Sequence, residues 1–500
     1  MMETKEVNSL GGMLSQDINK HGEITEEGIK IKGVGGEVNL KFKQEVNSDW
    51  MIKNEFIQLI SGRDKKWGEA SELLTNYIKS WMHIYTTKDD NKSEVWIYDQ
   101  GIYIPNGKCR IKEFLRNLLG SFYSQYIYGL VINKVEPDTF VESNEFFSCK
   151  YPNEICLENG ILNVETLELQ PYTHKKIFFN KMPVKFNLKA QCPNIEKFLK
   201  DVLSNEEDIR VIEEYLGFAL MDTYVYEKSL MMHGQGRNGK GKCIELFKRL
   251  FGMNNCSAIP LTSLKSDDFA VSELFGKRLN LAGDIGNQDL KDTSMFKSLT
   301  GRDLVSGKRK FMNNIPFMNN AKFIFACNEL PMVYDTTRGF WDRWLLLDFP
   351  YTFVTQEEYD QTINKDFLKI KDDFIIDKIS NEEELSGLLN LALVGLQRLK
   401  DHKKFSITKG SEEIKQMWIR RSNSFMAFAM DCLMESYESK IPKRYLRKKY
   451  TDYCKEHKIK TKTDYVIKKV IQEEFGGSET RILTELEGQI WFWEGIKLKN

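Results

Sequence analysis

One short segment restricts the fold of this chain more than any other: a glycine-rich loop between an apolar strand and an amphipathic helix. Apolar residues 230–232 lead into Gly234-Gln235-Gly236-Arg237-Asn238-Gly239-Lys240, which has the spacing G-x-x-x-x-G-K. Behind the loop, apolar side chains recur at spacings of three and four until a glycine at 252: Cys243, Leu246, Phe247, Leu250 and Phe251. A strand, this loop and a helix in that order predict a loop that wraps the phosphates of a nucleotide.

The chemistry of the loop follows from its residue types. The glycines let backbone amides turn inward around a phosphate, and the N-terminus of the following helix adds partial positive charge. Lys240 is predicted to reach the β- and γ-phosphates. Gly241 stands where the pattern has a Mg²⁺-holding Ser or Thr, and Lys242 ends the candidate loop. We therefore expect ATP and Mg²⁺ as ligands, with the metal held through water and other side chains. The alternative is a glycine-rich turn before an ordinary helix.

Two further apolar strands end in polar residues. The strand at 277–283 leads into Asp284, a carboxylate suited to hold Mg²⁺ through water and to polarise the attacking water. The strand at 321–327 leads into Asn328, whose amide is suited to position that water. The structural alternatives are a surface strand that happens to end in Asp, and an Asn that caps a turn or helix. Asp289, further along the chain, is a second and weaker candidate for the catalytic carboxylate.

Basic residues gather after these strands in two places. Arg338 and Arg343 lie in the segment 335–344, and one of them is predicted to reach the γ-phosphate of a neighbouring subunit. Residues 303–316 are typical of a β-hairpin with a polar turn, and they contain Lys308, Arg309 and Lys310 followed by an aromatic residue. Charge for phosphates and a ring for stacking suit single-stranded DNA. The alternatives are a solvated basic strand or a subunit contact across the nucleotide site.

Composition limits the remaining possibilities. The chain has 500 residues, and at about 150 residues per domain it predicts roughly three domains. Its 72 Lys and Arg are balanced by 72 Asp and Glu, so net charge indicates no partner. The nine cysteines are dispersed and the histidines stand singly, which argues against zinc and favours a reducing compartment. With an N-terminus that lacks an apolar segment and no long apolar run, we expect a bacterial, archaeal or host cell cytoplasm and no membrane.

The last part of the chain, 424–500, has the pattern of a small basic domain. Leu446, Tyr450 and Tyr453 recur at helical spacing, and Tyr445 beside them is predicted to lie on the same face, among many lysines and arginines. Strand-like residues 481–483 and 489–493 follow a Gly-Gly turn. Helices followed by two strands favour a winged-helix-like domain that binds an origin or other duplex DNA. The alternative is a charged, solvated helix.

Taken together, these motifs resemble superfamily 3 helicases, in particular the phage/plasmid primase-helicase family related to the poxvirus-type primase-helicases. The loop at 234–240 and the strand into Asp284 match. Residues 297–303 resemble the family's Thr-Gly-Gly-Asp segment, with Arg302 in place of a glycine. Residues 328–331 match Asn-x-Leu-Pro, and 339–343 match Gly-Phe-Trp-x-Arg. Upstream, 158–162 and 190–193 resemble the domain that precedes this ATPase. The resemblance covers 93–495 and is most specific from 229 to 350.

The resemblance implies an α/β fold, with an AAA+-like ATPase core between an N-terminal α+β domain and the winged-helix-like domain. It implies a homo-hexamer whose ATP sites are shared between subunits, and 3′-to-5′ translocation along single-stranded DNA. By the same resemblance Lys240 binds phosphate, Asp284 holds Mg²⁺ and Asn328 is the sensor. Arg343 is the first candidate for the arginine finger and Arg338 the second, and a finger contributes about 10³- to 10⁵-fold in turnover.

These expectations combine into a domain plan and a function. The plan is an N-terminal arm and helical region (1–90), a primase-helicase N-terminal-like domain (91–205), the ATPase core (206–365), a helical connector (366–423) and the C-terminal domain (424–500). The function is an ATP-dependent replicative DNA helicase of a phage, plasmid, virus or mobile element, with a separate primase or loading partner since no primase domain is evident. One alternative is an origin-binding initiator that uses ATP as an assembly switch. Another is an AAA+ remodeller that does not act on DNA.

Overall fold

The structure is a computed structural model. It describes residues 22–25, 28–33, 36–41, 44–88, 93–148, 150–267, 269–283, 289–309, 314–335, 337–407, 409–457, 459–484 and 488–499, with side chains from Ser48 onwards except at 484 and 488. The chain divides into two compact units. The first comprises Met1–Asp99 with Tyr103–Phe146, and the second Gln100–Ile102 with Phe147–Asn500. The five-part division expected from the sequence stays a prediction.

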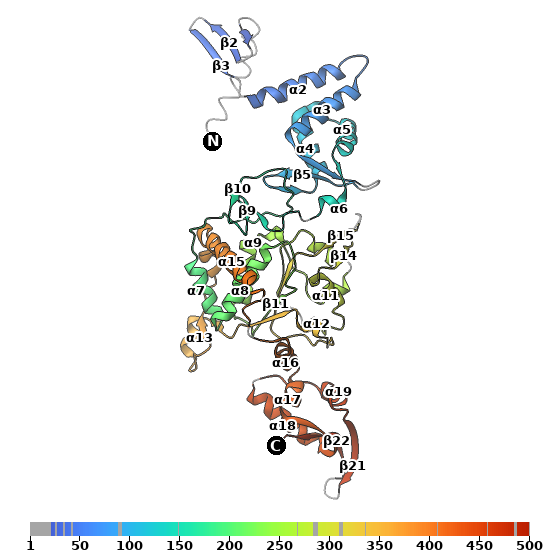
Figure 1. Ribbon diagram of the computed structural model, residues 1–500, viewed down its shortest axis with the longest axis vertical. Coiled ribbons are helices and arrows are strands. Elements are labelled where there is room, and N and C mark those ends of the chain that lie inside the picture. The colour runs from blue at the N-terminus through green and yellow to red at the C-terminus, as the bar shows by residue number, and fades with distance from the viewer. Residues whose placement is uncertain are drawn as a thin grey trace. The chain divides into compact units, whose positions relative to one another are not determined.

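The first unit contains two sheets and a group of helices (Figure 1). One is an antiparallel sheet of β1 (Gly22–Thr25), β2 (Gly28–Gly33) and β3 (Gly36–Lys41). The helices are α2 (Gln44–Ile60), α3 (Trp67–Trp81), α4 (Gly107–Leu119), α5 (Gln125–Asp138) and the short α6 (Ser143–Phe146). A second sheet has the order β6-β5-β4-β7, from β4 (Ile84–Thr87), β5 (Val95–Asp99), β6 (Ile102–Ile104) and β7 (Phe140–Val141). Phe56, Leu74, Ile111 and Val131 are fully buried among these helices.

The second unit is built on a five-stranded parallel sheet with the order β12-β13-β16-β11-β17. Its strands are β11 (Ser229–His233), β12 (Cys256–Ser257), β13 (Leu279–Ala282), β16 (Lys322–Cys327) and β17 (Trp344–Asp348). Almost all residues of the four longer strands are buried, as a parallel sheet covered on both faces requires. A mixed α/β class with a parallel sheet is thereby confirmed.

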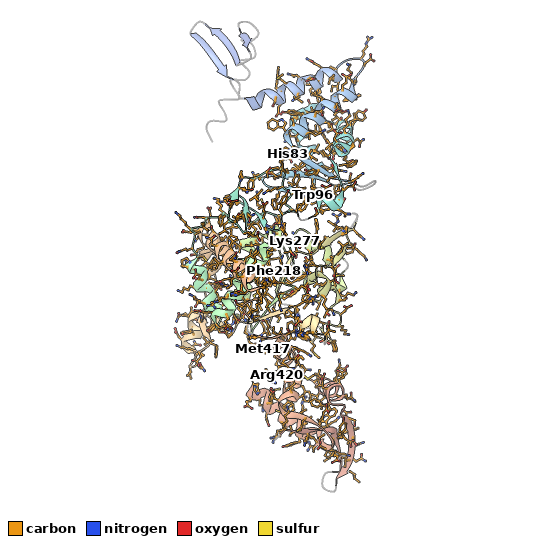
Figure 2. The ribbon with its side chains drawn as sticks, viewed as in Figure 1. His83, Trp96, Phe218, Lys277, Met417 and Arg420 are labelled. Carbon is orange, nitrogen blue, oxygen red and sulfur yellow. The ribbon has the colours of Figure 1, made fainter. Side chains whose placement is uncertain are left out.

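Helices and small sheets surround this parallel sheet. The helices are α7 (Pro193–Val202), α8 (Glu206–Leu220), α9 (Lys240–Phe251), α10 (Ser263–Ser266), α11 (Ser294–Thr300), α12 (Arg338–Trp341), α13 (Gln356–Gln361), α14 (Ile375–Ile379), α15 (Glu382–His402) and α16 (Ser411–Ser422). The additional strands are β8 (Glu154–Leu157), β9 (Gly160–Asn163), β10 (Leu169–Gln170), β14 (Leu304–Gly307), β15 (Ile315–Met318), β18 (Thr352–Val354) and β19 (Leu368–Ile370). Phe218 of α8 lies fully buried among the packed side chains (Figure 2).

Helices α8 and α15 pack with their backbones in contact. A Cβ atom at Gly217 of α8 would lie 2.6 Å from the Leu396 nitrogen, and one at Gly395 of α15 would lie 2.5 Å from the Glu213 carbonyl oxygen. Only glycine fits at these two positions. Beside the glycines, Arg398 donates to the carboxylates of Glu213 and Glu214, each at 2.7 Å. This glycine seam therefore joins a helix that precedes the parallel sheet to one that follows it.

The C-terminal module of the second unit, which we define as 424–499, has three helices and one antiparallel sheet. The helices are α17 (Ser424–Cys432), α18 (Lys443–Glu456) and α19 (Asp464–Phe475), and the sheet order is β20 (Leu433–Pro442), β22 (Gly488–Leu498) and β21 (Ser478–Thr484). The expected helix and both expected strands are present. Leu446 and Tyr450 are buried, but Tyr445 is 47% exposed, so the prediction that it shares their packed face is wrong. Successive residues of an α-helix lie about 100° apart around its axis, and this rotation carries Tyr445 off the face of Leu446.

Candidate functional site

The glycine-rich loop begins where β11 ends, at the carboxyl edge of the parallel sheet. β11 lies between β16 and β17, and His233 pairs with Cys327 on one side and with Asp348 on the other. Asn328 directly follows Cys327 and therefore comes to the same edge. Parallel α/β sheets bind ligands at the carboxyl ends of their strands, so the loop and Asn328 share the expected position for a ligand site.

The ammonium of Lys240 lies inside the loop. It donates to the carbonyl oxygens of Gly234 at 2.7 Å and of Gln235 at 3.2 Å, and to Asn238 Oδ1 at 3.0 Å. It also donates to Asn328 Oδ1 at 3.1 Å. The Lys240 side chain is buried, at 5% exposed. The structure thus brings the predicted phosphate-binding lysine and the predicted sensor amide together.

Two glycines of the loop occupy positions that no other residue fits. A Cβ atom at Gly234 would lie 2.5 Å from the carbonyl oxygen of Phe349, and one at Gly239 would lie 2.6 Å from Val202 Cγ1. Gly239 also has a φ of 89°, in the region that favours glycine. Buried Asn238 donates to the same Phe349 carbonyl at 3.3 Å. These contacts hold the loop in a tight turn that leaves its backbone able to approach a ligand closely.

The other loop residues differ in their surroundings. A Cβ atom at Gly236 or at Gly241 would meet no heavy atom within 4 Å among the described residues. Arg237 donates to both carboxylate oxygens of Glu358 in α13 at 3.0 Å. Lys242 donates to Glu245 at 3.3 Å. Gly236 and Gly241 therefore have open space where a side chain would lie, whereas Arg237 and Lys242 each form an ion pair with a glutamate.

The predicted metal ligand, Asp284, lies outside the described residues, as do 285–288. The strand that leads to it is described up to Gly283. A Cβ atom at Gly283 would lie 3.6 Å from Ile244 Cδ1 of α9, the helix that follows the loop. The strand therefore ends beside that helix. Asp289, the second candidate carboxylate, accepts a hydrogen bond from the Tyr334 hydroxyl at 3.2 Å.

Arg343 lies at the opposite end of the sheet from the loop. Its carbonyl oxygen accepts a hydrogen bond from the Ser229 amide at 2.7 Å, and Ser229 is the first residue of β11. The loop follows the last residue of the same strand. A strand of five residues is about 16 Å long. The guanidinium donates to Thr300 Oγ1 at 2.8 Å and forms an ion pair with Glu227 at 3.1 Å. The structure therefore does not bring Arg343 to the loop of its own chain.

Arg338 differs from Arg343 in exposure. It stands at the start of α12, its side chain is 88% exposed, and it forms an ion pair with Asp342 at 3.2 Å. The Arg343 side chain is only 15% exposed. Of the two candidate fingers, Arg338 is the one that a neighbouring molecule reaches without breaking buried contacts.

The expected basic hairpin is present. β14 and β15 pair antiparallel, from Leu304 opposite Met318 to Gly307 opposite Ile315. Lys308 and Arg309 follow β14 directly, and Lys310 lies outside the described residues. The hairpin therefore carries the first two basic residues to its turn, as the sequence predicts.

A cluster beside the loop was not expected from the sequence. Asp348, at the end of β17, lies 3.2 Å from His233 Nδ1 and forms an ion pair with Arg421 of α16, whose Nη2 is 3.0 Å away. Burial opposes ionisation of Asp348, but the hydrogen bonds from His233 and Arg421 outweigh it and hold the pKa of this carboxyl well below its usual range. Arg421 follows Asp348 by 73 residues, so no local pattern indicated the pair.

Within the part of the chain that the structure describes, none of the helices is both long and apolar enough to cross a membrane. Two family models match the chain. Residues 40–204 match the model described as D5 N terminal like, and residues 232–343 match a family of unknown function, DUF5906.

Two viral proteins are similar in sequence. "Putative helicase L207/L206" of Acanthamoeba polyphaga mimivirus is 28% identical over 181 residues, which are 35% of this chain and 19% of that protein. "Putative helicase V13" of Sputnik virophage is 21% identical over 298 residues, which are 57% of this chain and 37% of that protein. The chain thus spans only a minor part of the length of both relatives.

Solved structures of one protein resemble the chain at a low level. The apo structure of the NrS-1 C-terminal region (305–718) has 14% sequence identity and a TM-score of 0.46, covering 85% of this chain and 98% of that one. A second structure of the region, the A form, has a TM-score of 0.43 at 14% identity, with 84% and 99% covered. Through the D5 N-terminal-like segment and the two viral relatives, the chain is similar to phage and viral primase-helicases.

Proposed function

We propose that this chain is an ATP-dependent replicative DNA helicase of superfamily 3 that serves a phage, plasmid, virus or other mobile element. One observation carries the proposal: the Lys240 ammonium is buried in a glycine-rich loop and lies 3.1 Å from Asn328 Oδ1 at the carboxyl edge of a parallel sheet. A lysine for the phosphates and an amide for the attacking water, in contact at one edge, are what hydrolysis of a nucleoside triphosphate needs.

The surroundings of Lys240 fit a triphosphate. The turn at Gly234 and Gly239 excludes side chains, and the open positions at Gly236 and Gly241 leave room for phosphate oxygens. The phosphates would take over the ammonium hydrogen bonds that the loop carbonyls now accept. When bound, Mg²⁺ neutralises charge that develops on the phosphate oxygens. Asp284 would hold the metal, with water in place of a hydroxyl at position 241.

The position of the arginines supports ATP sites that are shared between identical subunits. Arg343 stands at the far end of β11 from its own loop, so it can serve only the loop of another copy. Closed rings of one chain, hexamers in this proposal, place such opposite edges against each other. Exposure favours Arg338 as the finger, while the motif match favours Arg343. Either one would stabilise charge on the γ-phosphate of the neighbour.

Single-stranded DNA is the proposed track. Lys308 and Arg309 at the end of β14, together with Lys310, would grip its phosphates while hydrolysis moves the hairpins, in the 3′-to-5′ direction. The order of helices and strands in the C-terminal module supports a winged-helix-like domain for duplex or origin DNA. A separate primase or loading protein completes the proposal.

A second candidate is an origin-binding initiator that uses ATP as an assembly switch without processive unwinding. It is favoured by Gly241, which supplies no hydroxyl for Mg²⁺, and by the single acid at position 284. A switch would bind ATP and turn it over slowly, whether or not single-stranded DNA is present.

Strand displacement and DNA-stimulated ATP hydrolysis test the proposal. Wild type is compared with Lys240→Ala and with Lys248→Ala, which removes a lysine from the last turn of the same helix. We expect unwinding by wild type and Lys248→Ala, and none by Lys240→Ala. Equal unwinding by Lys240→Ala would end the helicase proposal. ATP binding with no stimulation by DNA and no unwinding would favour the initiator.

A further inference from the structure

We propose that the β21–β22 hairpin of the C-terminal module is a stacking site for the unpaired bases of nucleic acid, centred on the indole ring of Trp491. The site is separate from Lys308 and Arg309, and it includes only the first residue of the basic helix α18, Lys443. It rests on the proposed function in one respect, namely that the chain acts on nucleic acid.

The strand register places an aromatic and basic surface on one face of the hairpin. Trp491 lies directly opposite Arg481, and Trp493 opposite Glu479. Because side chains two residues apart share a face of a sheet, these four point to the same side. Trp493 is buried in the core of the module, at 4% exposed, whereas Trp491 is 46% exposed. Figure 1 shows β21 and β22 projecting beyond α18 and α19, so the core face continues past the helices that cover it.

Two cations lie against the exposed ring. Lys443 Nζ is 5.2 Å from the centre of the Trp491 ring and 4.4 Å from that of Trp493. Arg481 Cζ is 5.6 Å from the Trp491 ring centre on the neighbouring strand. Cations at this distance are attracted to the ring and hold it in place. Trp491 is therefore a positioned ring with positive charge over it.

The charge of this surface is positive after its ion pairs are counted. One carboxylate, Glu479, serves both Lys443 and Lys468, with Lys468 Nζ at 3.0 Å. The hydrogen bond from Lys443 holds the pKa of Glu479 below its ordinary value against the effect of burial, so this carboxylate is ionised at neutral pH. Two lysines share one negative charge, and Arg481 adds a further positive charge.

The oriented Trp491 ring and the excess positive charge near it suit single-stranded nucleic acid. Bases stack on exposed aromatic rings, and nearby cations neutralise the phosphates. Paired bases inside a duplex offer no free face, so unpaired bases are the partner that uses the ring.

The test is binding of the full chain to short labelled oligonucleotides, followed by fluorescence anisotropy without nucleotide. Wild type, Trp491→Ala and Trp491→Phe are compared on an oligothymidylate and on an abasic strand of equal length. To reduce binding elsewhere, all variants also carry Lys308→Ala and Arg309→Ala. Tyr437→Ala is the matched control, because Tyr437 is an 86% exposed aromatic residue on β20 of the same module.

We expect Trp491→Ala to weaken binding of the oligothymidylate by about 5- to 100-fold, the effect of losing one stacked base. Binding of the abasic strand should not change, since it has phosphates but no bases. Trp491→Phe should retain most of the affinity, and Tyr437→Ala all of it. Retention by the Phe variant, together with an unchanged melting temperature, separates stacking from a folding defect.

Other outcomes overturn the inference. Equal losses on both strands would assign the effect to phosphate contact or to folding. No loss on either strand would leave Trp491 without a role in nucleic-acid binding. Trp491-dependent binding to phosphatidylserine vesicles in place of oligonucleotides would identify a membrane surface instead. The result is independent of hydrolysis: the helicase proposal fails through Lys240→Ala, and the stacking site fails through Trp491→Ala.

Discussion

The ammonium of Lys240 donates a hydrogen bond to Asn328 Oδ1 at 3.1 Å, although 88 residues separate the two in the chain. The contact follows from the sheet, because β11 and β16 are parallel neighbours and both residues follow their carboxyl ends. It fixes the direction of the Asn328 amide. Its oxygen faces the lysine, so its nitrogen is the group left for a water or a phosphate oxygen.

Replacing Asn328 should therefore affect hydrolysis more than binding. We expect Asn328→Ala to lower the rate of ATP hydrolysis by about 10²- to 10³-fold, the usual cost of losing one oriented polar group. ATP affinity should change little, because Lys240 remains. Asn328→Asp should instead weaken ATP binding, since its charge pairs with Lys240 and repels the γ-phosphate. Steady-state hydrolysis and nucleotide titrations measure both; equal binding by the two variants would contradict this role.

Gly241 offers a test of the metal site by gain of function. A side chain there meets open space, and the position lies in the first turn of α9. We expect Gly241→Ser to lower the Mg²⁺ concentration that gives half-maximal hydrolysis, because it supplies the missing hydroxyl. Gly241→Ala is the control, since both substitutions favour the helix by a few tenths of a kcal/mol or more. Identical Mg²⁺ dependence of the two variants would count against a metal at this position.

The two arginines can be told apart by mixing subunits. The variant that lacks the finger should bind ATP normally but lose about 10³- to 10⁵-fold in turnover. Mixed with Lys240→Ala subunits, it should recover part of the activity, since some shared sites then contain both groups. No recovery at any ratio would contradict sites shared between subunits.

The melting temperature of each variant is a second way to distinguish Arg343 from Arg338. Arg343→Ala should also lower it, because buried Thr300 loses its donor and Glu227 its cation. Arg338→Ala should leave it unchanged, since that side chain is 88% exposed. Loss of turnover at an unchanged melting temperature therefore identifies Arg338 as the finger.

The Asp348 cluster predicts a dependence of stability on pH. The folded pKa of Asp348 lies below its unfolded value of about 3.9. Its contribution is thus fully present above about pH 4 and is lost as the pH falls toward the folded pKa. Asp348→Asn should reduce the free energy of unfolding at pH 7 by about 1–3 kcal/mol, because Arg421 loses its partner. The difference in free energy of unfolding between wild type and Asp348→Asn should shrink below pH 4 in urea titrations. A difference that stays constant down to pH 2 would rule out a stabilising role for the ionised Asp348 carboxylate.

The sequence predicts well those structures that residues close together in the chain determine. The loop at 234–240, the strand into Asn328 and the β14–β15 hairpin each carry their signal within a few residues, and all three are present. Contacts between distant segments leave no such signal. The pairing of Asp348 with Arg421, and the buried engagement of Arg343 by Thr300 and Glu227, depend on which helices and strands become neighbours.

Some local structure was also not anticipated. Helices α4 and α5 were not among the expected elements, although the surrounding region was expected to be α+β. Helix α4 begins after Asn106 in a left-handed conformation, and α5 contains Pro137 in its last turn. Asn-Gly pairs and prolines are typical of turns, so the local sequence of each helix predicts a turn and not a helix. Burial of their apolar faces decides the outcome.

The glycine seam between α8 and α15 has a mechanical consequence. Because the two backbones touch at Gly217 and Gly395, one helix cannot slide along the other without atoms overlapping. The pair therefore behaves as one stiff body. If the chain exchanges nucleotide as we propose, the accompanying movement has to occur in segments that this contact does not hold.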